Sequence, residues 1–232
     1  MPLQNYVLGP RKRVIETMKT DDLIKMLSCD DAHMAPLPDV RVAVAGNVLI
    51  LMFVLTILHV YTGMGIRTNY IIAMSSWLVC LKQILPASMA FSLLPFLCKL
   101  SSPQSIARPA SWRYLILILP MIILFITSLS GLDGVLLMAA MQGETLLKCL
   151  IVVPTLSILG SYIIISALKH GAPSYPVQSG FWVGVTSGAF VCIFYAFSCT
   201  EDSPLFYAIW YSVGIGISGI FGAVIGHFKL RW

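Results

Sequence analysis

Charged residues are scarce in this chain, and their scarcity excludes an ordinary water-soluble domain. Only 11% of the 232 residues are Asp, Glu, Lys or Arg, whereas 58% are hydrophobic, and the mean hydropathy is +0.87. In soluble domains about a quarter of the residues are charged. The composition therefore predicts an integral membrane protein that is all-α, because helices satisfy their own backbone polar groups in lipid.

Signatures of catalysis are also missing. The chain has no H-E-x-x-H motif, no glycine-rich phosphate loop and no convincing order of Ser, His and Asp. Six cysteines occur, but no two form the C-x-x-C pair that a membrane thiol oxidoreductase uses. We therefore expect no enzyme activity and no resident cofactor.

Six apolar runs are about long enough to cross a bilayer as helices. They lie near residues 43–62, 71–97, 113–130, 146–168, 180–198 and 205–227. The second run contains Lys82, Pro86 and Pro95, so we expect a kink or a tilt there. A six-span bundle over residues 42–232 follows, and the first run begins too far from the start for a secretory signal.

The distribution of Lys and Arg predicts the orientation, since positively charged loops stay cytoplasmic. With both termini inside, twelve of the 15 basic residues fall on the cytoplasmic side (Arg11, Lys12, Arg13, Lys19, Lys25, Arg41, Lys99, Arg108, Arg113, Lys169, Lys229 and Arg231). Only Arg67 and Lys148 fall on the outer side. We expect a multi-pass membrane protein with both termini in the cytoplasm.

Residues 1–41 form the expected cytoplasmic arm. From Met18 onward the arm has five acidic and three basic residues, so it is not a polybasic lipid or nucleic-acid tail. A short helix is expected after Thr20, with acids in its first turn and apolar residues at helical spacing (Asp21, Asp22, Leu23, Ile24 and Leu27). It is too short to be stable alone, so it either folds on a partner or frays.

Two cysteines fall at similar depth on the outer side. Cys149 opens the fourth span and Cys199 closes the fifth, and these two spans have nearly equal length. If the two spans pack closely, the thiols form either a disulfide or a soft-metal site. Glu201 and Asp202 are candidates to complete such a site, and Lys148 to favour the thiolate. The alternative is that both cysteines only pack at a helix end.

Small residues recur every fourth position in the last two spans. Gly180, Gly184 and Gly188 form one stripe in the fifth span, while the sixth carries Ser218, Gly222 and Gly226. Such stripes allow two helix backbones to approach closely. They predict tight packing of the fifth span against a neighbour.

Four motifs resemble a family of bacterial integral-membrane anti-sigma factors, the negative regulators of sigma F (NrsF). They are M-K-T-D-D-L-I at 18–24, K-H-G-A-P at 169–173, C-T-E-D-S-P-L-F-Y-A-I-W-Y at 199–211, and K-L-R-W at 229–232. The resemblance covers Met18 to Trp232, so residues 1–17 are expected to be an extension before the family start. The chain departs from the family's G-x-R-P-D turn, because it has Asn69 where the family has the acid.

The resemblance implies that the arm holds an extracytoplasmic-function sigma factor inactive at the membrane. The candidate contact residues are those of the expected short helix (Asp21, Asp22, Leu23, Ile24 and Leu27). It also implies that Cys149 and Cys199 are the sensing pair, which heavy-metal or oxidative stress engages. A small six-span transporter or metal exporter is the alternative, with Lys82 and His59 beside its path. Against it, all ten acidic residues lie in loops or in the arm.

Overall fold

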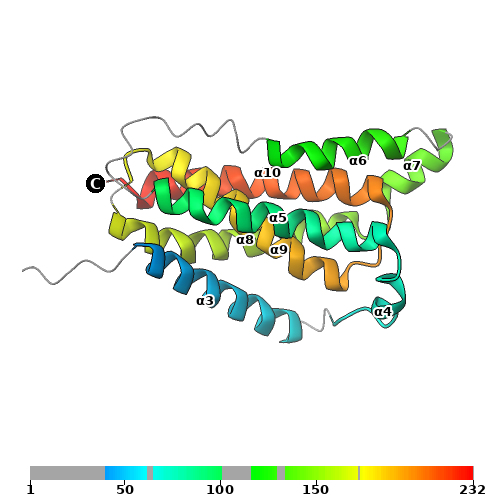
Figure 1. Cartoon of the computed structure of the whole chain (residues 1–232), viewed down its shortest axis with the longest axis horizontal. Coiled ribbons are helices and arrows are strands. Elements are labelled where there is room, and N and C mark those ends of the chain that lie inside the picture. The colour runs from blue at the N-terminus through cyan, green and yellow to red at the C-terminus, as the bar shows by residue number, and fades with distance from the viewer. Residues whose placement is uncertain (1–39, 62–64, 101–115, 130–133, 172, 232) are drawn as a thin grey trace, which may run out of the picture. The chain divides into compact units, whose positions relative to one another are not determined.

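The computed structural model describes residues 40–61, 65–100, 116–129, 134–171 and 173–231, and this part of the chain is helical, without strands (Figure 1). With the labels of Figure 1, the helices are α3 (Val40–Tyr61), α4 (Tyr70–Ala73), α5 (Trp77–Leu100), α6 (Leu119–Leu129), α7 (Gly134–Gln142), α8 (Leu146–Leu168), η3 (Lys169–Gly171), α9 (Pro176–Ser198) and α10 (Pro204–Lys229). The all-α prediction is confirmed for these residues.

Five helices are long and apolar enough to span a membrane: α3, α5, α8, α9 and α10. α8 has the bounds expected for the fourth span. The third expected span, 113–130, corresponds to the shorter apolar segment Ile116–Leu129, in which α6 has 11 residues. At 1.5 Å per residue α6 covers about half of a ~30 Å hydrocarbon core. The total of six spans therefore stays a prediction.

The second expected span differs at its start. The apolar run was placed at 71–97, but α5 begins at Trp77, and residues 70–73 form the separate helix α4. Pro86 and Pro95 both lie inside α5, which continues through them to Leu100. From Trp77 onward the run is therefore one helix, which the two prolines do not divide.

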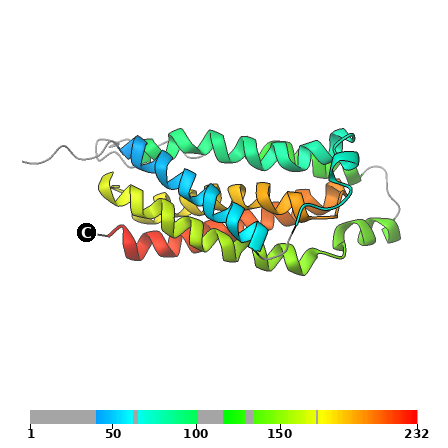
Figure 2. The same ribbon diagram turned by 90° about the horizontal axis from the view of Figure 1, so that it is seen from below.

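α9 is the central helix of the bundle. In α9, 78% of residues are buried, against no more than 44% in any other candidate span. It packs against α10, α8, α5 and α3, while α6 and α7 pack on α10. α3 runs obliquely to the other long helices in both views (Figures 1 and 2). α9 is thus held from several sides.

The two ends of the bundle differ in the chain segments they carry. α3 begins, and α5, α8 and α10 end, at one end of the bundle (Figure 1). The turn 199–203, which connects α9 to α10, lies at the opposite end, called here the thiol end. The three acids in the described part, Glu144, Glu201 and Asp202, are in loops of the thiol end.

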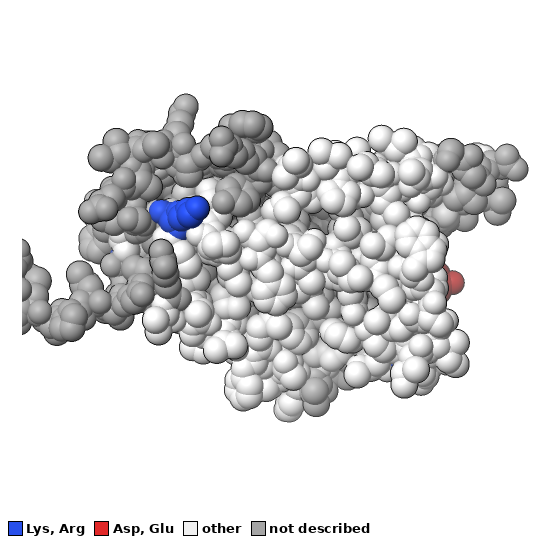
Figure 3. All heavy atoms as spheres, in the orientation of Figure 1, with Lys and Arg blue, Asp and Glu red and all other residues white. Residues whose placement is uncertain are grey.

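The surface between the two ends is largely uncharged. Figure 3 shows this on one face, with Lys or Arg near one end and Asp or Glu near the other. Large apolar side chains such as Leu49 (69% exposed) and Phe53 (66% exposed) point outward, whereas Ser157, Ser187 and Ser218 are buried. An apolar exterior around a core that contains small polar groups suits a protein surrounded by lipid.

Candidate functional site

Cys199 opens the turn 199–203. α9 ends at Ser198, and Cys199 is extended (φ −75°, ψ 120°) while its N–H still donates to the Tyr195 carbonyl at 3.0 Å. Pro204 then begins α10, because proline has no N–H to satisfy and its fixed φ suits the first helical turn. Two helix ends therefore position the Cys199 thiol.

Cys149 lies in the first turn of α8, where its N–H donates to the Thr145 carbonyl at 3.0 Å. The Thr145 hydroxyl lies 3.8 Å from the Cys199 Sγ. Thr145 therefore contacts Cys149 through its backbone and, through its side chain, also reaches Cys199. The structure thus brings together the two cysteines that the sequence pointed to, both as free thiols.

Both thiols are buried within the helix ends instead of lying open at the surface. Cys149 is 0% exposed and Cys199 is 2% exposed. A third buried thiol, Cys192, lies two turns earlier on α9. An ion or oxidant that reaches the pair must therefore pass between the helix ends, or the turn must move.

Asp202 forms an ion pair with Arg67, which lies between α3 and α4. Arg67 donates from both terminal nitrogens to the two carboxylate oxygens, each at 2.8 Å. Such two-point contacts are among the stronger hydrogen bonds in proteins. The hydrogen bond to Asp202 raises the pKa of Arg67 above its usual value. Asp202 thus binds the loop before α4 and does not face the thiols.

Lys82 of α5 is buried at 1% exposure and reaches the same turn. Its Nζ donates to the carbonyl oxygens of Cys199 at 2.7 Å and Glu201 at 2.6 Å. It also lies 3.6 Å from the Asp202 carboxylate. The lysine that was considered for a transport path is instead paired inside the bundle.

Glu201 and Lys148 do not surround the thiols as the sequence led us to expect. The Glu201 carboxylate accepts a hydrogen bond from the Glu144 N–H at 2.7 Å, and Lys148 is exposed. The lysine that reaches the turn 199–203 is instead Lys82, which binds the Cys199 carbonyl. Chain adjacency to Cys149 was therefore a poor guide to its electrostatic surroundings.

No group of three or more His, Cys, Asp or Glu side chains is arranged to hold a metal ion in the part of the chain that the structure describes. Asp202 binds Arg67 and Lys82, and Glu201 binds the Glu144 N–H. A soft metal ion at this site would have the two sulfurs as its protein ligands, unless these carboxylates left their present partners.

The small-residue stripes meet at the interface of α9 with α10. A Cβ on Gly184 would collide with the Ser218 carbonyl oxygen, and one on Gly188 would lie 2.9 Å from the Ser218 Cβ. Gly180 meets Gly222 and Gly226 in the same way. At these glycines the two backbones therefore approach too closely for a side chain, which fixes the relative position of the helices on either side of the turn.

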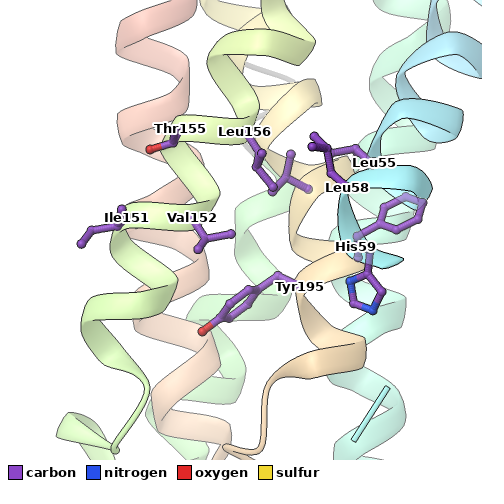
Figure 4. Close-up of a pocket in the computed structure, with 10 residues that line it drawn as sticks. Leu55, Leu58, His59, Ile151, Val152, Thr155, Leu156 and Tyr195 are labelled. Atoms are coloured by element: carbon purple, nitrogen blue, oxygen red, sulfur yellow. The ribbon is translucent and has the colours of Figure 1, made fainter. Parts of the chain in front are cut away.

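An apolar cavity of about 160 Å³ lies between α3, α8 and α9 (Figure 4). Leu55, Leu58 and His59 on α3 face Val152 and Leu156 on α8, and Tyr195 lies between them (Figure 4). His59 is 3.4 Å from the Ser198 hydroxyl. With few polar groups, the cavity offers little to bind an ion or a polar substrate.

The residues proposed to contact a sigma factor (Asp21, Asp22, Leu23, Ile24 and Leu27) lie outside the described residues. Arg67 and the pairing of Lys82 were missed as parts of the site. One signal was available for each: a lysine in an apolar run requires a partner, and Arg67 is one of two basic residues on the outer side.

Comparisons with known proteins agree with the three motifs between residues 169 and 232, whereas the motif at 18–24 lies before the matched residues and stays a prediction. Residues 30–232 match the family described as NrsF, negative regulator of sigma F. The Anti-sigma-F factor NrsF of Caulobacter vibrioides is 39% identical over 66 residues, which are 28% of this chain and 31% of that protein. The Probable anti-sigma-F factor NrsF of Azospira oryzae is 30% identical over 90 residues, 39% of this chain and 42% of that protein. The aligned stretches thus span less than half of either relative. No solved structure matches.

Proposed function

The chain belongs to the NrsF family, and from this we propose that it is a membrane-bound anti-sigma factor. The N-terminal arm, residues 1–41, binds an extracytoplasmic-function sigma factor at the cytoplasmic face and makes no contact with nucleic acid itself. Stress that engages Cys149 and Cys199 on the opposite face releases the sigma factor. The printed names of both relatives, which are anti-sigma-F factors, support the regulatory part.

The observation that carries the sensor part is the meeting of two free thiols at one end of the bundle. Cys149 lies at the start of α8 and Cys199 directly after α9, both are buried, and Thr145 contacts both of them. Two chemistries suit such a pair. A soft metal ion binds between two thiolates, or an oxidant accepts two electrons and two protons as the disulfide forms.

The orientation in the inner membrane rests on charge. Twelve of the 15 Lys and Arg residues fall in segments assigned to the cytoplasm, as positively charged loops do. The thiol end then faces outward, and α3 begins at the inner end, directly after the arm. Stress outside is thereby separated from the sigma factor inside by the packed helices.

Coupling between the two faces needs only a modest free-energy difference. A ligand shifts a conformational equilibrium by as much as it prefers one state, and a tenfold change in sigma affinity corresponds to about 1.4 kcal/mol. The tight α9–α10 interface favours transmission, because packed backbones move together. Engagement of Cys199 at the end of α9 would therefore shift both helices.

Co-purification tests the proposal. The solubilised full-length chain should retain an extracytoplasmic-function sigma factor of its own cell. Leu23→Asp with Leu27→Asp should abolish retention, because both changes place charge on the apolar face of the expected arm helix. Leu8→Asp, in the expected extension, is the matched control and should retain the sigma factor. A wild-type chain that retains no sigma factor would contradict the proposal.

A further inference from the structure

Lys82 is a buried charge whose position needs an explanation. An ammonium group inside a bundle loses its hydration, and this is tolerated only where hydrogen bonds and an opposite charge replace the water. Here the replacement comes from the turn 199–203: the carbonyl oxygens of Cys199 and Glu201 at 2.7 and 2.6 Å, and the Asp202 carboxylate at 3.6 Å.

A second cation holds the same turn from the opposite direction. The Arg67 side chain binds both oxygens of Asp202 at 2.8 Å. The Arg67 backbone N–H donates to the carbonyl of Phe197, near the end of α9, at 3.2 Å. Arg67 comes from the α3–α4 connection and Lys82 from α5. Two elements remote in sequence thus bind one turn, through its backbone carbonyls and through the shared Asp202 carboxylate.

Apart from the two cations, a side-chain hydrogen bond ties the turn to another segment, from the Glu144 N–H to the Glu201 carboxylate at 2.7 Å. No side chain caps the N-terminus of α10, and the Cys199 thiol has only long contacts, at 3.8 Å to Thr145 and 4.0 Å to the Glu201 carbonyl. The residue that supplies the thiol also supplies a carbonyl to Lys82. Any movement that exposes the Cys199 thiol therefore strains or breaks a charged hydrogen bond.

We propose that Arg67, Lys82 and Asp202, called here the charged cluster, keep the turn 199–203 closed over Cys149 and Cys199. They are positioning residues for the thiols. The closed turn excludes large reagents, and its opening makes Cys199 available. The biological meaning of this inference rests on the proposed sensor function, but the closure itself is measurable without a sigma factor.

Thiol labelling tests the closure. The purified full-length chain in nanodiscs, where both faces are accessible, is treated with a bulky polar maleimide, and modified peptides are quantified by mass spectrometry. Chymotryptic cleavage at Phe197 separates Cys192 from Cys199. Lys82→Met and Asp202→Asn should each raise the labelling rate of Cys199 at least ~10-fold, because a charged hydrogen bond contributes more than a tenfold factor in an equilibrium.

Two controls separate closure from general loosening. Lys99→Met removes an exposed lysine of the same helix and should leave labelling unchanged. Cys192 is buried two turns deeper on α9, and its labelling should stay slow in every variant. Lys82→Arg keeps the positive charge and should restore part of the protection that Lys82→Met loses.

Two outcomes would overturn the inference. Cys199 labelling that stays at the wild-type rate in both variants shows that the charged cluster does not hold the turn. Equal acceleration at Cys192 and Cys199 shows that the substitutions loosen the whole bundle. Faster labelling of Cys199 alone, with stress induction in cells unaffected, supports the closure and counts against the thiols as sensors, so the two proposals fail separately.

Discussion

A methyl group on Gly222 would lie 2.6 Å from the Cα of Gly184 on the facing helix, nearer than real Cβ atoms approach a neighbour. α9 and α10 therefore touch through their backbones, and glycine is required where they do. Gly216, on the same helix, has nothing within 4 Å of an added Cβ. The two positions form a matched pair in which only the facing surface differs.

Gly222→Ala should destabilise the bundle by about 1–3 kcal/mol, the usual effect of inserting a methyl group into a well-packed interface. Gly216→Ala should not destabilise it, because alanine favours helix and meets no neighbour there. Unfolding of the reconstituted protein in a denaturing detergent titration measures both. Equal loss of stability in the two variants would be evidence against backbone contact between α9 and α10.

Cys149→Ser together with Cys199→Ser should preserve sigma repression and abolish stress induction. The substitutions remove the soft ligands and the redox chemistry, but change little volume at two buried positions. A reporter gene under the sigma factor, measured with and without a heavy-metal salt or peroxide, checks both parts. Cys80→Ser is the control and should respond normally, and full induction in the double variant would exclude the pair as the sensor.

Arg67→Gln and Asp202→Asn should be non-additive in stability, with a coupling of about 0.5–3 kcal/mol, as for residues in one ion pair. The hydrogen bond to Asp202 raises the pKa of Arg67. A raised pKa means that the stabilisation is complete below the unfolded value and is lost only above the folded value. The coupling should therefore stay constant between about pH 6 and about pH 9. Additive effects would show that the pair contributes nothing.

Introduced cysteines test the sidedness of the bundle. In the Cys149→Ser, Cys199→Ser background, Thr200→Cys at the thiol end should react with a membrane-impermeant maleimide in intact cells. Ser174→Cys, exposed between α8 and α9, should react only after the cells are opened. The reverse pattern would place the thiol end in the cytoplasm and remove the basis for an outward-facing sensor.

The sequence alone determined the features that depend on neighbouring residues. Helical spans follow from consecutive apolar residues, since lipid offers the backbone no other hydrogen-bond partners, and α8 spans Leu146–Leu168 as the apolar run predicted. The small-residue stripes were visible from their four-residue period. The third span shows the limit, because α6 is shorter than its apolar run and hydropathy does not specify where a helix ends.

The tertiary structure alone decided which distant groups meet. Lys82 and the Cys199 carbonyl are far apart in the chain, so no local pattern links them, and packing brought Lys82 to the turn while Lys148, next to Cys149, stayed exposed. Packing also buried both thiols and directed Asp202 to Arg67. Hydropathy and helical period act along the chain, whereas burial and charge pairing act across space and depend on how the helices finally pack.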